Sequence, residues 1–251
     1  MMKMIGKTLR KLMPLAFWLA VWACACFAVG QELLLPSPLS VFKRLAFVTE
    51  GKFWASVGMS IWRTAAAYGI GVLAGIVLAA LCHANKTADE LIGPALSVVR
   101  ATPVASFIIL ALVWLSSSNV PILAGVLMVT PVVFANVREG LNAVDPKLKE
   151  MGRMFGWSRW KRMRHIDIPS VLPVFLAACE SCVGLCFKAT IAAEVIGVPK
   201  NAVGTQLYNA KIYLETDTLL AWTLVVILLS MLLEKLLKRA FERGLRRGRH
   251  H

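Results

Sequence analysis

The chain has 251 residues, of which 58% are hydrophobic and 17% charged, and its mean hydropathy of +0.67 lies outside the range of soluble globular domains. We therefore expect an all-α integral membrane protein, with one domain over residues 1–251 because no linker or charge block separates a second one. The formal net charge of +14 comes from basic residues gathered in the connections between apolar runs. Membrane topology accounts for this charge, so no nucleic-acid partner is expected.

Six apolar runs are long enough to cross a bilayer, which takes about 20 residues. They lie near 12–30, 57–82, 96–115, 119–137, 169–196 and 218–236. The first run follows four basic residues, as a signal peptide would, but it is long for one and no cleavage site stands clear of its apolar core. We predict that it is kept as the first membrane-spanning helix.

The segment 33–56, after the first run, is predicted to lie on the outer, periplasmic side as an interfacial helix. Apolar residues such as Val41 and Phe42 fall on one side of it, and Lys43 and Arg44 fall on another. This pattern is typical of a helix that lies flat on the membrane surface.

The distribution of Lys and Arg predicts the orientation. The connections assigned to the cytoplasm carry 20 of these residues, and the outer ones carry 5. Because positive residues stay on the cytoplasmic side, we predict that both termini face the cytoplasm. The basic C-terminal tail is expected to lie on anionic lipid headgroups, and its final pair, His250 and His251, could come from an added tag.

Charged residues in the spans are functional candidates, because charge is costly inside a membrane. Arg63 and Arg100 lie near predicted span ends, where a long side chain can reach the headgroups. Glu180, Lys188 and Glu194 lie deeper, in the fifth span. On a helix Glu180 and Lys188 are about 80° apart and share one broad face, while Glu194 points elsewhere. We expect that face to look into a protein interface or an aqueous path, and structural ion pairing stays open beside solute contact.

Two prolines, Pro103 and Pro131, fall inside the third and fourth spans. Each frees a backbone carbonyl and permits a kink, as in many helices that line transport paths. The candidate residues of a translocation path are Arg100, Pro103, Glu180, Lys188 and Glu194.

Small residues in the spans predict close helix packing. Gly69, Gly71 and Gly75 recur in the second span at helical spacing. The six cysteines all lie in apolar runs, and although three of them at 179–186 have a ligand-like spacing, we interpret them as packing residues and expect no metal site. No phosphate-binding loop is complete, so we expect no cofactor on this chain and any ATP hydrolysis on another one.

The most informative stretch is the basic segment from Glu150 to Pro173, within the connection 138–168. It is too polar to cross a bilayer, Gly156 separates two short helix-like stretches, and prolines mark the entry to the next span. We interpret it as a docking segment for a soluble partner, with a loop that merely lies on lipid as the alternative.

This segment resembles the EAA loop in the permease subunits of bacterial ABC importers, whose pattern is Glu-Ala-Ala, three residues, Gly, nine residues and Ile-x-Leu-Pro. Glu150, Gly156, Ile166 and Pro169 fall at those positions. Met151 and Gly152 replace the two alanines, and Ile168 replaces the leucine. The runs LPSP at 35–38, RATP at 100–103, VDP at 144–146 and AAEVIG at 192–197 are similar to the nitrate, sulfonate and taurine class of that family.

The resemblance implies a type I importer fold of about six transmembrane helices, with a cytoplasmic coupling helix between spans four and five. It implies a location in the bacterial inner membrane and a non-catalytic subunit that forms the path for a small solute such as a sulfonate, taurine or nitrate. The implied partners are cytoplasmic ATPase subunits, which bind ATP and Mg, a solute-binding protein and a second permease copy. The residues implied to couple the permease to the ATPase are Glu150, Gly156, Trp157, Ser158, Trp160, Ile166 and Pro169.

Two other functions are alternatives to an importer subunit. A self-sufficient secondary transporter often shows an internal repeat, and none is visible between residues 12–115 and 119–236. A membrane-embedded enzyme would need convergent His, Asp or Glu side chains at one depth, and the predicted spans contain no His.

Overall fold

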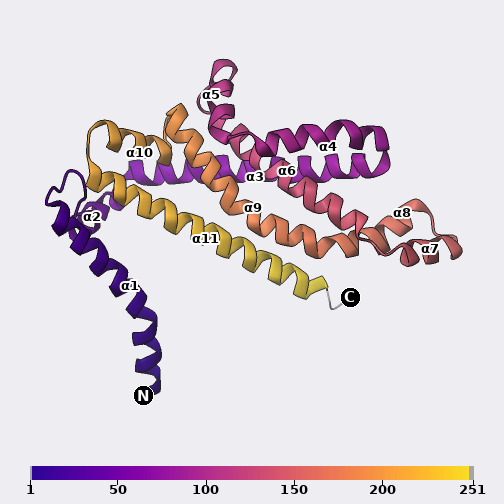
Figure 1. Cartoon of the computed structure of the whole chain (residues 1–251), viewed down its shortest axis with the longest axis horizontal. Helices are drawn as coiled ribbons and strands as arrows, with labels where there is room; N and C mark the ends of the chain where they lie inside the picture. Colours follow the sequence, from indigo (N-terminus) through magenta and orange to yellow (C-terminus); the bar gives the residue numbers. More distant parts are fainter. Residues whose placement is uncertain (1, 249–251) are drawn as a thin grey trace.

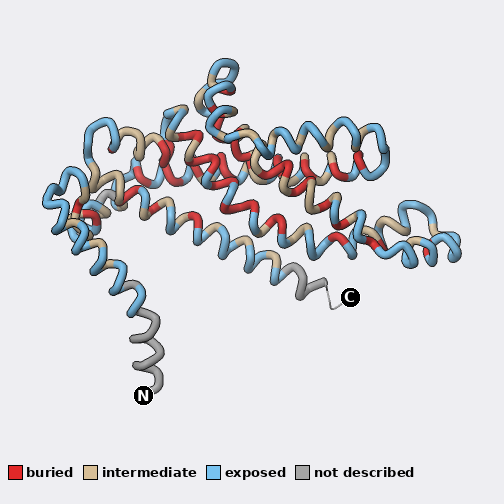
Figure 2. The backbone as a smooth tube through the Cα atoms, in the orientation of Figure 1, coloured by how far each residue is buried: buried red, intermediate tan, exposed pale blue. Residues whose placement is uncertain are grey.

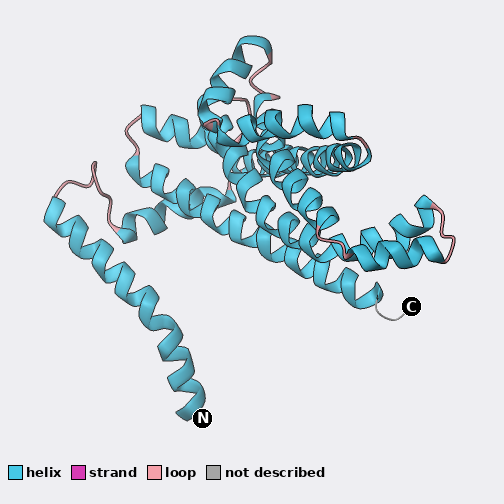
Figure 3. Cartoon of the chain, turned by 45° about the vertical axis from the view of Figure 1, so that its right-hand side comes forward, coloured by secondary structure: helices cyan, strands magenta, loops and turns pink. Residues whose placement is uncertain are grey.

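The computed structural model describes the backbone of residues 2–248 and the side chains of residues 13–243, except 15 and 47. Every regular element in this part of the chain is helical, as predicted (Figure 3). The elements are α1 (Met2–Val29), α2 (Pro38–Arg44), the 3₁₀ turn η1 (Leu45–Thr49), α3 (Gly51–Ala84), α4 (Lys86–Ala101), α5 (Val104–Trp114), α6 (Val120–Asn142), α7 (Pro146–Met154), α8 (Arg159–Arg162), the π-helical turn η2 (Met163–Asp167), α9 (Ile168–Gly197), α10 (Val203–Ile212) and α11 (Thr216–Gly248). The final pair, His250 and His251, lies outside the described residues.

Four helical regions are long and apolar enough to cross a membrane, and they match the second, fourth, fifth and sixth predicted spans. They are Gly51–Ala84, Val120–Asn142, Arg159–Gly197 and Thr216–Arg243. The first predicted span is helical too, and the stretch of it with side chains described without a gap, Ala16–Val29, is apolar. The count of six spans therefore stays a prediction.

The third predicted span, 96–115, is a bent pair of helices and not one straight helix. The pair α4 and α5 is bent by 103° at a break that contains Thr102 and Pro103. The backbone N–H of Thr102 and its hydroxyl both donate to the carbonyl of Val98, which ends α4. Pro103 then precedes α5, where its missing N–H costs no intrahelical bond.

Pro131 has the opposite outcome, because α6 continues through it without a break. Pro131 is buried, and α6 packs along its length against α3 and α9, whereas Pro103 is exposed. Pro131 is therefore accommodated within a packed helix, whereas Pro103 stands between two helices.

The core lies where α3, α6 and α9 pack together, and the buried positions concentrate on these helices (Figure 2). A Cβ atom added to Gly71 would lie 2.7 Å from the Cβ of Val129, and one added to Gly75 would lie 2.8 Å from the Cβ of Val133. Both glycines let α3 approach α6 closely, as predicted. Gly69 does not, because a Cβ there would meet no atom within 4 Å.

The predicted connections sort to two ends of the molecule. The helices α2 and α10 lie at one end, while α7, α8 and the turn between α3 and α4 lie at the other, toward which α11 runs (Figure 1). Helix α1 leaves the body of the molecule from its junction with α2 (Figure 1). The assignment of the α7–α8 end to the cytoplasm stays a prediction from the distribution of basic residues.

In the segment 33–56, which is predicted to lie on the outer side, a short helix follows the Pro-Ser-Pro turn. Ser37 caps α2, which ends after seven residues and is followed by η1 and the start of α3. Val41 is fully buried and α2 packs against α11, whereas Phe42 is exposed. The two apolar residues therefore face different surroundings, and Val41 anchors the segment to the protein.

We expect Gly71→Ala to lower the stability of the detergent-solubilised chain by about 1–3 kcal/mol, because the added methyl group overlaps Val129 in a packed interface. Gly69→Ala is the matched control on the same helix, and it should be neutral or slightly stabilising because the Cβ meets open space. Thermal unfolding of both variants measures the difference. Equal melting temperatures would contradict the close approach of α3 and α6.

Candidate functional site

The connection between α6 and α9 folds into a compact segment of two short helices, α7 and α8. Asp145 caps α7, because its side chain accepts a hydrogen bond from the backbone N–H of Lys147 at 2.9 Å, and Pro146 occupies the first turn. Ser158 caps α8 in the same way, accepting from the N–H of Lys161 at 3.3 Å. We call residues 145–167 the coupling segment.

Gly156 forms the turn between α7 and α8. Its φ of 66° is in the left-handed region, its N–H donates to the carbonyl of Arg153, and the N–H of Trp157 donates to the carbonyl of Gly152. These two bonds are those of a Schellman motif, the helix ending that favours glycine because it has no Cβ. The position of Gly156 in the predicted docking pattern therefore has a local physical reason.

The aromatic residues of the coupling segment have different environments. Trp157 is half-buried, with the ring of His165 at 5.7 Å between centroids and the Nζ of Lys161 over its face at 5.0 Å. Trp160 is 69% exposed, so only this tryptophan presents its whole face to a partner.

Two further apolar side chains extend this exposed surface, and the sequence analysis missed them. Met154 is 89% exposed and Phe155 is 72% exposed. They end α7 immediately before Gly156, where the turn directs the chain away from the helix. Their signal in the sequence is a pair of large apolar residues within an otherwise basic connection. We call Met154, Phe155 and Trp160 the apolar surface of the coupling segment.

The other predicted coupling residues divide between surface and interior. Glu150 and Ser158 are exposed. Ile166 is buried and would lie 3.2 Å from a Cβ on Gly152, so it packs α7 onto the chain that leads into α9. Pro169 lies in the first turn of α9.

The coupling segment is joined to the fifth span without a flexible link. From α8 through η2 and α9 the chain is one helical region, Arg159–Gly197. The π-helical turn η2 lies directly before Pro169, which cannot donate to the carbonyl four residues back, so the bonding pattern shifts instead of the helix ending. A displacement of α8 would therefore be transmitted to α9.

The structure does not bring the five candidate path residues together. Arg100 is exposed at the end of α4 and lines a cavity of about 290 Å³ between α4 and α6, along with Ser97, Arg138 and Asn142. Pro103 lies at the break between α4 and α5.

The three candidates on α9 occupy separate surroundings. Glu180 pairs with Lys238 of α11 at 3.2 Å, and both side chains are substantially exposed. Lys188 is exposed on α9. Glu194 is completely buried. The predicted common face of Glu180 and Lys188 is thus partly covered by α11, which supplies an ion-pair partner to one of them.

Glu194 forms the most complete polar network in the described part of the chain. Its carboxylate accepts hydrogen bonds from the hydroxyl of Ser60 at 2.7 Å, from Arg63 at 3.1 Å and from the backbone N–H of Gly204 at 3.1 Å. Arg63 also donates to the carbonyls of Lys200 and Asn201. This network joins α3, α9 and the loop that leads into α10.

The expectation that Arg63 reaches the headgroups is wrong, because its side chain is only 5% exposed and faces Glu194. The apolar run on which it was based begins at residue 57, but α3 begins at Gly51 and carries Arg63 into the protein interior. A buried guanidinium needs a counter-charge, and Glu194 supplies it.

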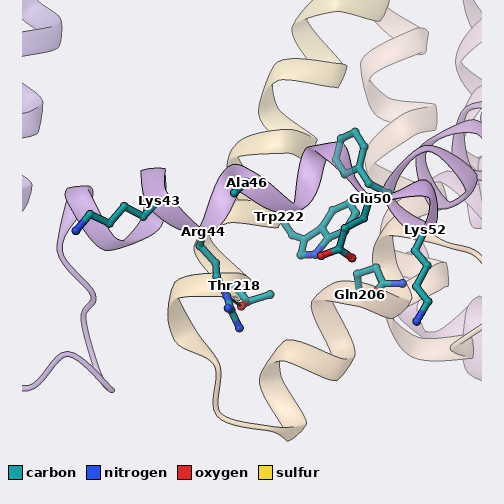
Figure 4. Close-up of a pocket in the computed structure, with 9 residues that line it drawn as sticks. Lys43, Arg44, Ala46, Glu50, Lys52, Gln206, Thr218 and Trp222 are labelled. Atoms are coloured by element: carbon teal, nitrogen blue, oxygen red, sulfur yellow. Dashed lines mark hydrogen bonds between the residues drawn. The ribbon is translucent and has the colours of Figure 1, made fainter.

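Another cavity with polar residues in its lining lies at the end of the molecule opposite the coupling segment. It measures about 410 Å³ and is lined by Lys43, Arg44, Glu50, Lys52 and Trp222, among others. Arg44 points toward Thr218 (Figure 4), to which it donates at 2.8 Å, and it pairs with Glu215 at 3.3 Å. This end of the protein is hollow and hydrophilic where α2, η1, α10 and α11 meet.

Comparison with known proteins identifies the family. The model of the binding-protein-dependent transport system inner membrane component matches residues 71–247. The chain belongs to this family. Its members include the permease subunits of ABC importers, and the resemblance carried by the coupling segment is confirmed. Helices α3 to α11 thus correspond to a membrane component of a transport system, with all or part of each within the match.

Relatives of this permease are named for the transport of different solutes. The chain is 27% identical to SsuC of Escherichia coli, an aliphatic sulfonates transport permease by name, over 84% of this chain and 81% of the relative. It is 25% identical to the taurine transport system permease protein TauC of Escherichia coli over 83% and 78%. It is 24% identical to the bicarbonate transport system permease protein CmpB of Synechococcus elongatus over 79% and 77%.

The fold has a counterpart among solved structures. A chain in the crystal structure of an amino acid ABC transporter with histidines superposes with a TM-score of 0.64 at 22% identity, covering 77% of this chain and 93% of that one. The likeness supports the arrangement of the helices in this permease and says nothing of its solute.

We expect Glu194→Gln and Arg63→Met each to destabilise the permease by about 3–5 kcal/mol, because each leaves a buried charge without its partner. The double variant should lose much less than the sum of the two, since both charges are then gone. Thermal unfolding in detergent measures this double-mutant cycle. Glu180→Gln is the control, worth about 0–1 kcal/mol, because its pair with Lys238 is exposed. Additive single effects would contradict a direct buried pair.

Proposed function

We propose that this chain is the permease subunit of an ATP-driven importer, in which the coupling segment docks on a separate ATPase and the spans form the path for a small solute delivered by a solute-binding protein. The observation that carries the proposal is the exposed apolar surface formed by Met154, Phe155 and Trp160 on an otherwise polar connection. Large exposed apolar and aromatic side chains within one short segment are typical of protein interfaces.

The continuity of the chain supports a mechanical role for this surface. An ATPase pair that closes on ATP would displace the coupling segments of two permease copies toward each other. Because α8, η2 and α9 form one helical region, the displacement would reach the fifth span directly. The helices α3 and α6 pack with α9 and would move with it, while the bent pair α4 and α5 offers a place where the path can open and close.

The charges near the predicted path favour a solute with an anionic group. In the sequence, the negative charges of Glu180 and Glu194 offset the positive charges of the basic residues in the predicted spans. In the structure each carboxylate has a cationic partner of its own, Lys238 and Arg63, so neither opposes an anion in the path. Arg100 has no such carboxylate within ion-pair distance among the described side chains, and it lines the cavity between α4 and α6 together with one other cation, Arg138, and one acidic residue, Glu139. Sulfonates, taurine and bicarbonate, named for the relatives, all carry an anionic group.

The outer end offers a place for the solute-binding protein. The polar cavity around Arg44 and Trp222 lies there, at the opposite end of the molecule from the coupling segment (Figures 1 and 4). In this arrangement the solute enters at one end and the energy of ATP acts at the other, and the permease itself catalyses no reaction.

Gly156→Val should abolish co-purification of the ATPase with the tagged permease when the two are expressed with the neighbouring genes. Valine at a φ of 66° costs at least about 1–2 kcal/mol, which would unfold the turn that presents the apolar surface. Gly156→Asn is the matched control, since asparagine tolerates the left-handed region and a Cβ here meets no atom within 4 Å. The measurements are ATPase recovery and ATP hydrolysis in the eluate. A permease purified alone in wild-type form, or full recovery with valine, would count against the coupling role.

Arg100→Gln should reduce ATP-dependent uptake into proteoliposomes by about tenfold or more, because a charged hydrogen bond to the solute contributes roughly 1.5–3 kcal/mol. Uptake of taurine, methanesulfonate and bicarbonate is measured with the ATPase and binding protein present. Arg100→Lys should keep part of the activity, and Arg239→Gln on α11 controls for a general change of charge. Unchanged uptake by Arg100→Gln, with the ATPase still bound, would remove Arg100 from the path.

A further inference from the structure

A third cavity lies beneath the coupling segment, between α7 and α8 and the ends of α3, α6 and α9. It measures about 870 Å³. Four cations line it, namely Lys149, Arg153, Arg159 and Arg162, and Asp167 is the one acidic side chain in its lining. We call this the basic cavity. Its lining carries an excess of three positive charges.

These cations have no carboxylate partners. Among the described side chains, none of the four lies within ion-pair distance of an acidic group, although other cations of the chain, such as Arg63 and Arg138, do. Lys149 donates only a long hydrogen bond of 3.4 Å to a backbone carbonyl. The Nε of Arg162 is buried without a hydrogen-bond acceptor, and Oδ1 of Asp167 is buried without a donor. Unpartnered buried groups are costly, and because the four cations outnumber this one carboxylate, the cavity as a whole favours a ligand that supplies anionic oxygen atoms.

Apart from His83 of α3, the rest of the cavity wall is apolar. It is formed by the ends of three membrane helices, with Ile76 from α3, Val137 from α6 and Phe175 from α9 among the lining residues. Leu172 and Ile168 of α9 also line it and are 38% and 51% exposed, so the apolar side is open along α9. A free inorganic anion would leave this surface uncovered. A ligand with an anionic head and a hydrocarbon tail would cover both parts.

We propose that the basic cavity binds one anionic phospholipid of the cytoplasmic leaflet, with its phosphate between Arg159 and Arg162 and an acyl chain along α3 and α9. The cavity lies at the end of the molecule that the distribution of basic residues assigns to the cytoplasm, the side on which anionic lipids attract such residues. The site goes beyond the proposed function, because it requires neither an ATPase nor a transported solute. A lipid in this position would fill the space between the coupling segment and the spans.

Native mass spectrometry of the full chain, released from detergent micelles, tests the site. The probes are 1-palmitoyl-2-oleoyl-phosphatidylglycerol and the phosphatidylcholine with the same acyl chains. We expect one phosphatidylglycerol to be retained in preference to phosphatidylcholine. The double variant Arg159→Gln/Arg162→Gln should weaken its binding about 25-fold, since each basic residue near anionic lipid contributes roughly a factor of five.

Three controls separate the site from general charge and from misfolding. Lys147→Gln/Arg164→Gln removes the same charge from the same segment outside the cavity lining and should retain the lipid. Arg159→Lys/Arg162→Lys keeps the charge and should also retain it, which shows that the segment tolerates substitution. Ala80→Phe places a ring in the apolar part of the cavity and should expel the lipid with no change of charge.

Several results would overturn the proposal. One is equal retention of the two lipids. Another is retention of phosphatidylglycerol by Arg159→Gln/Arg162→Gln at the wild-type level, or by Ala80→Phe, which would place the lipid outside the cavity. Displacement of the lipid by excess inorganic phosphate would assign the cations to a free anion instead.

Discussion

The constraint on which the half of the structure around α10 depends is the complete burial of the Glu194 carboxylate. A charge in that position persists only when it is paired and its oxygen atoms are saturated with hydrogen bonds. Arg63, Ser60 and the N–H of Gly204 meet this requirement from two separate parts of the chain. A Cβ on Gly204 would lie 2.4 Å from the Cβ of Glu194, so the glycine is needed for the N–H to reach the carboxylate. The pair therefore fixes α10 against α3 and α9.

The helices of the permease differ in how extensively they pack on this ion-paired unit. The helices α3, α6 and α9 pack tightly and are joined by the ion pair at one end and the coupling segment at the other. The bent pair α4 and α5 is attached less extensively, and α1 leaves the body of the molecule (Figure 1). In the proposed transport cycle, one group of helices moves as a rigid body relative to another. The tightly packed α3, α6 and α9 suit the rigid body, and the less extensively packed pair α4 and α5 suits the part that shifts against it.

The sequence predicted the features that depend on local composition and missed those that depend on distant contacts. Hydropathy located α3, α6, α9 and α11, because a run of about 20 apolar residues is the length that a membrane-spanning helix requires. The turn at Gly156 was predictable from a glycine within a polar connection. The pairing of Arg63 with Glu194 was not, since 131 residues separate them and both lie in apolar runs. Pro103 and Pro131 gave the same signal in the sequence, but Pro103 follows the end of α4, whereas α6 continues through Pro131.

The pairing of charges separates structural residues from candidate ligand-binding ones. Arg63 and Arg138, whose neighbours are membrane helices, each have a carboxylate partner, which is Glu194 or Asp89. Those two cations are satisfied within the chain and have no need of a ligand. Arg159 and Arg162 line the basic cavity with no ion-pair partner among the described carboxylates. Because an unpaired cation beside a low-dielectric surface is unfavourable, the fold is most stable when an external anion completes it. The unpaired cations of the basic cavity, like Arg100, are thus available to recognise an anion.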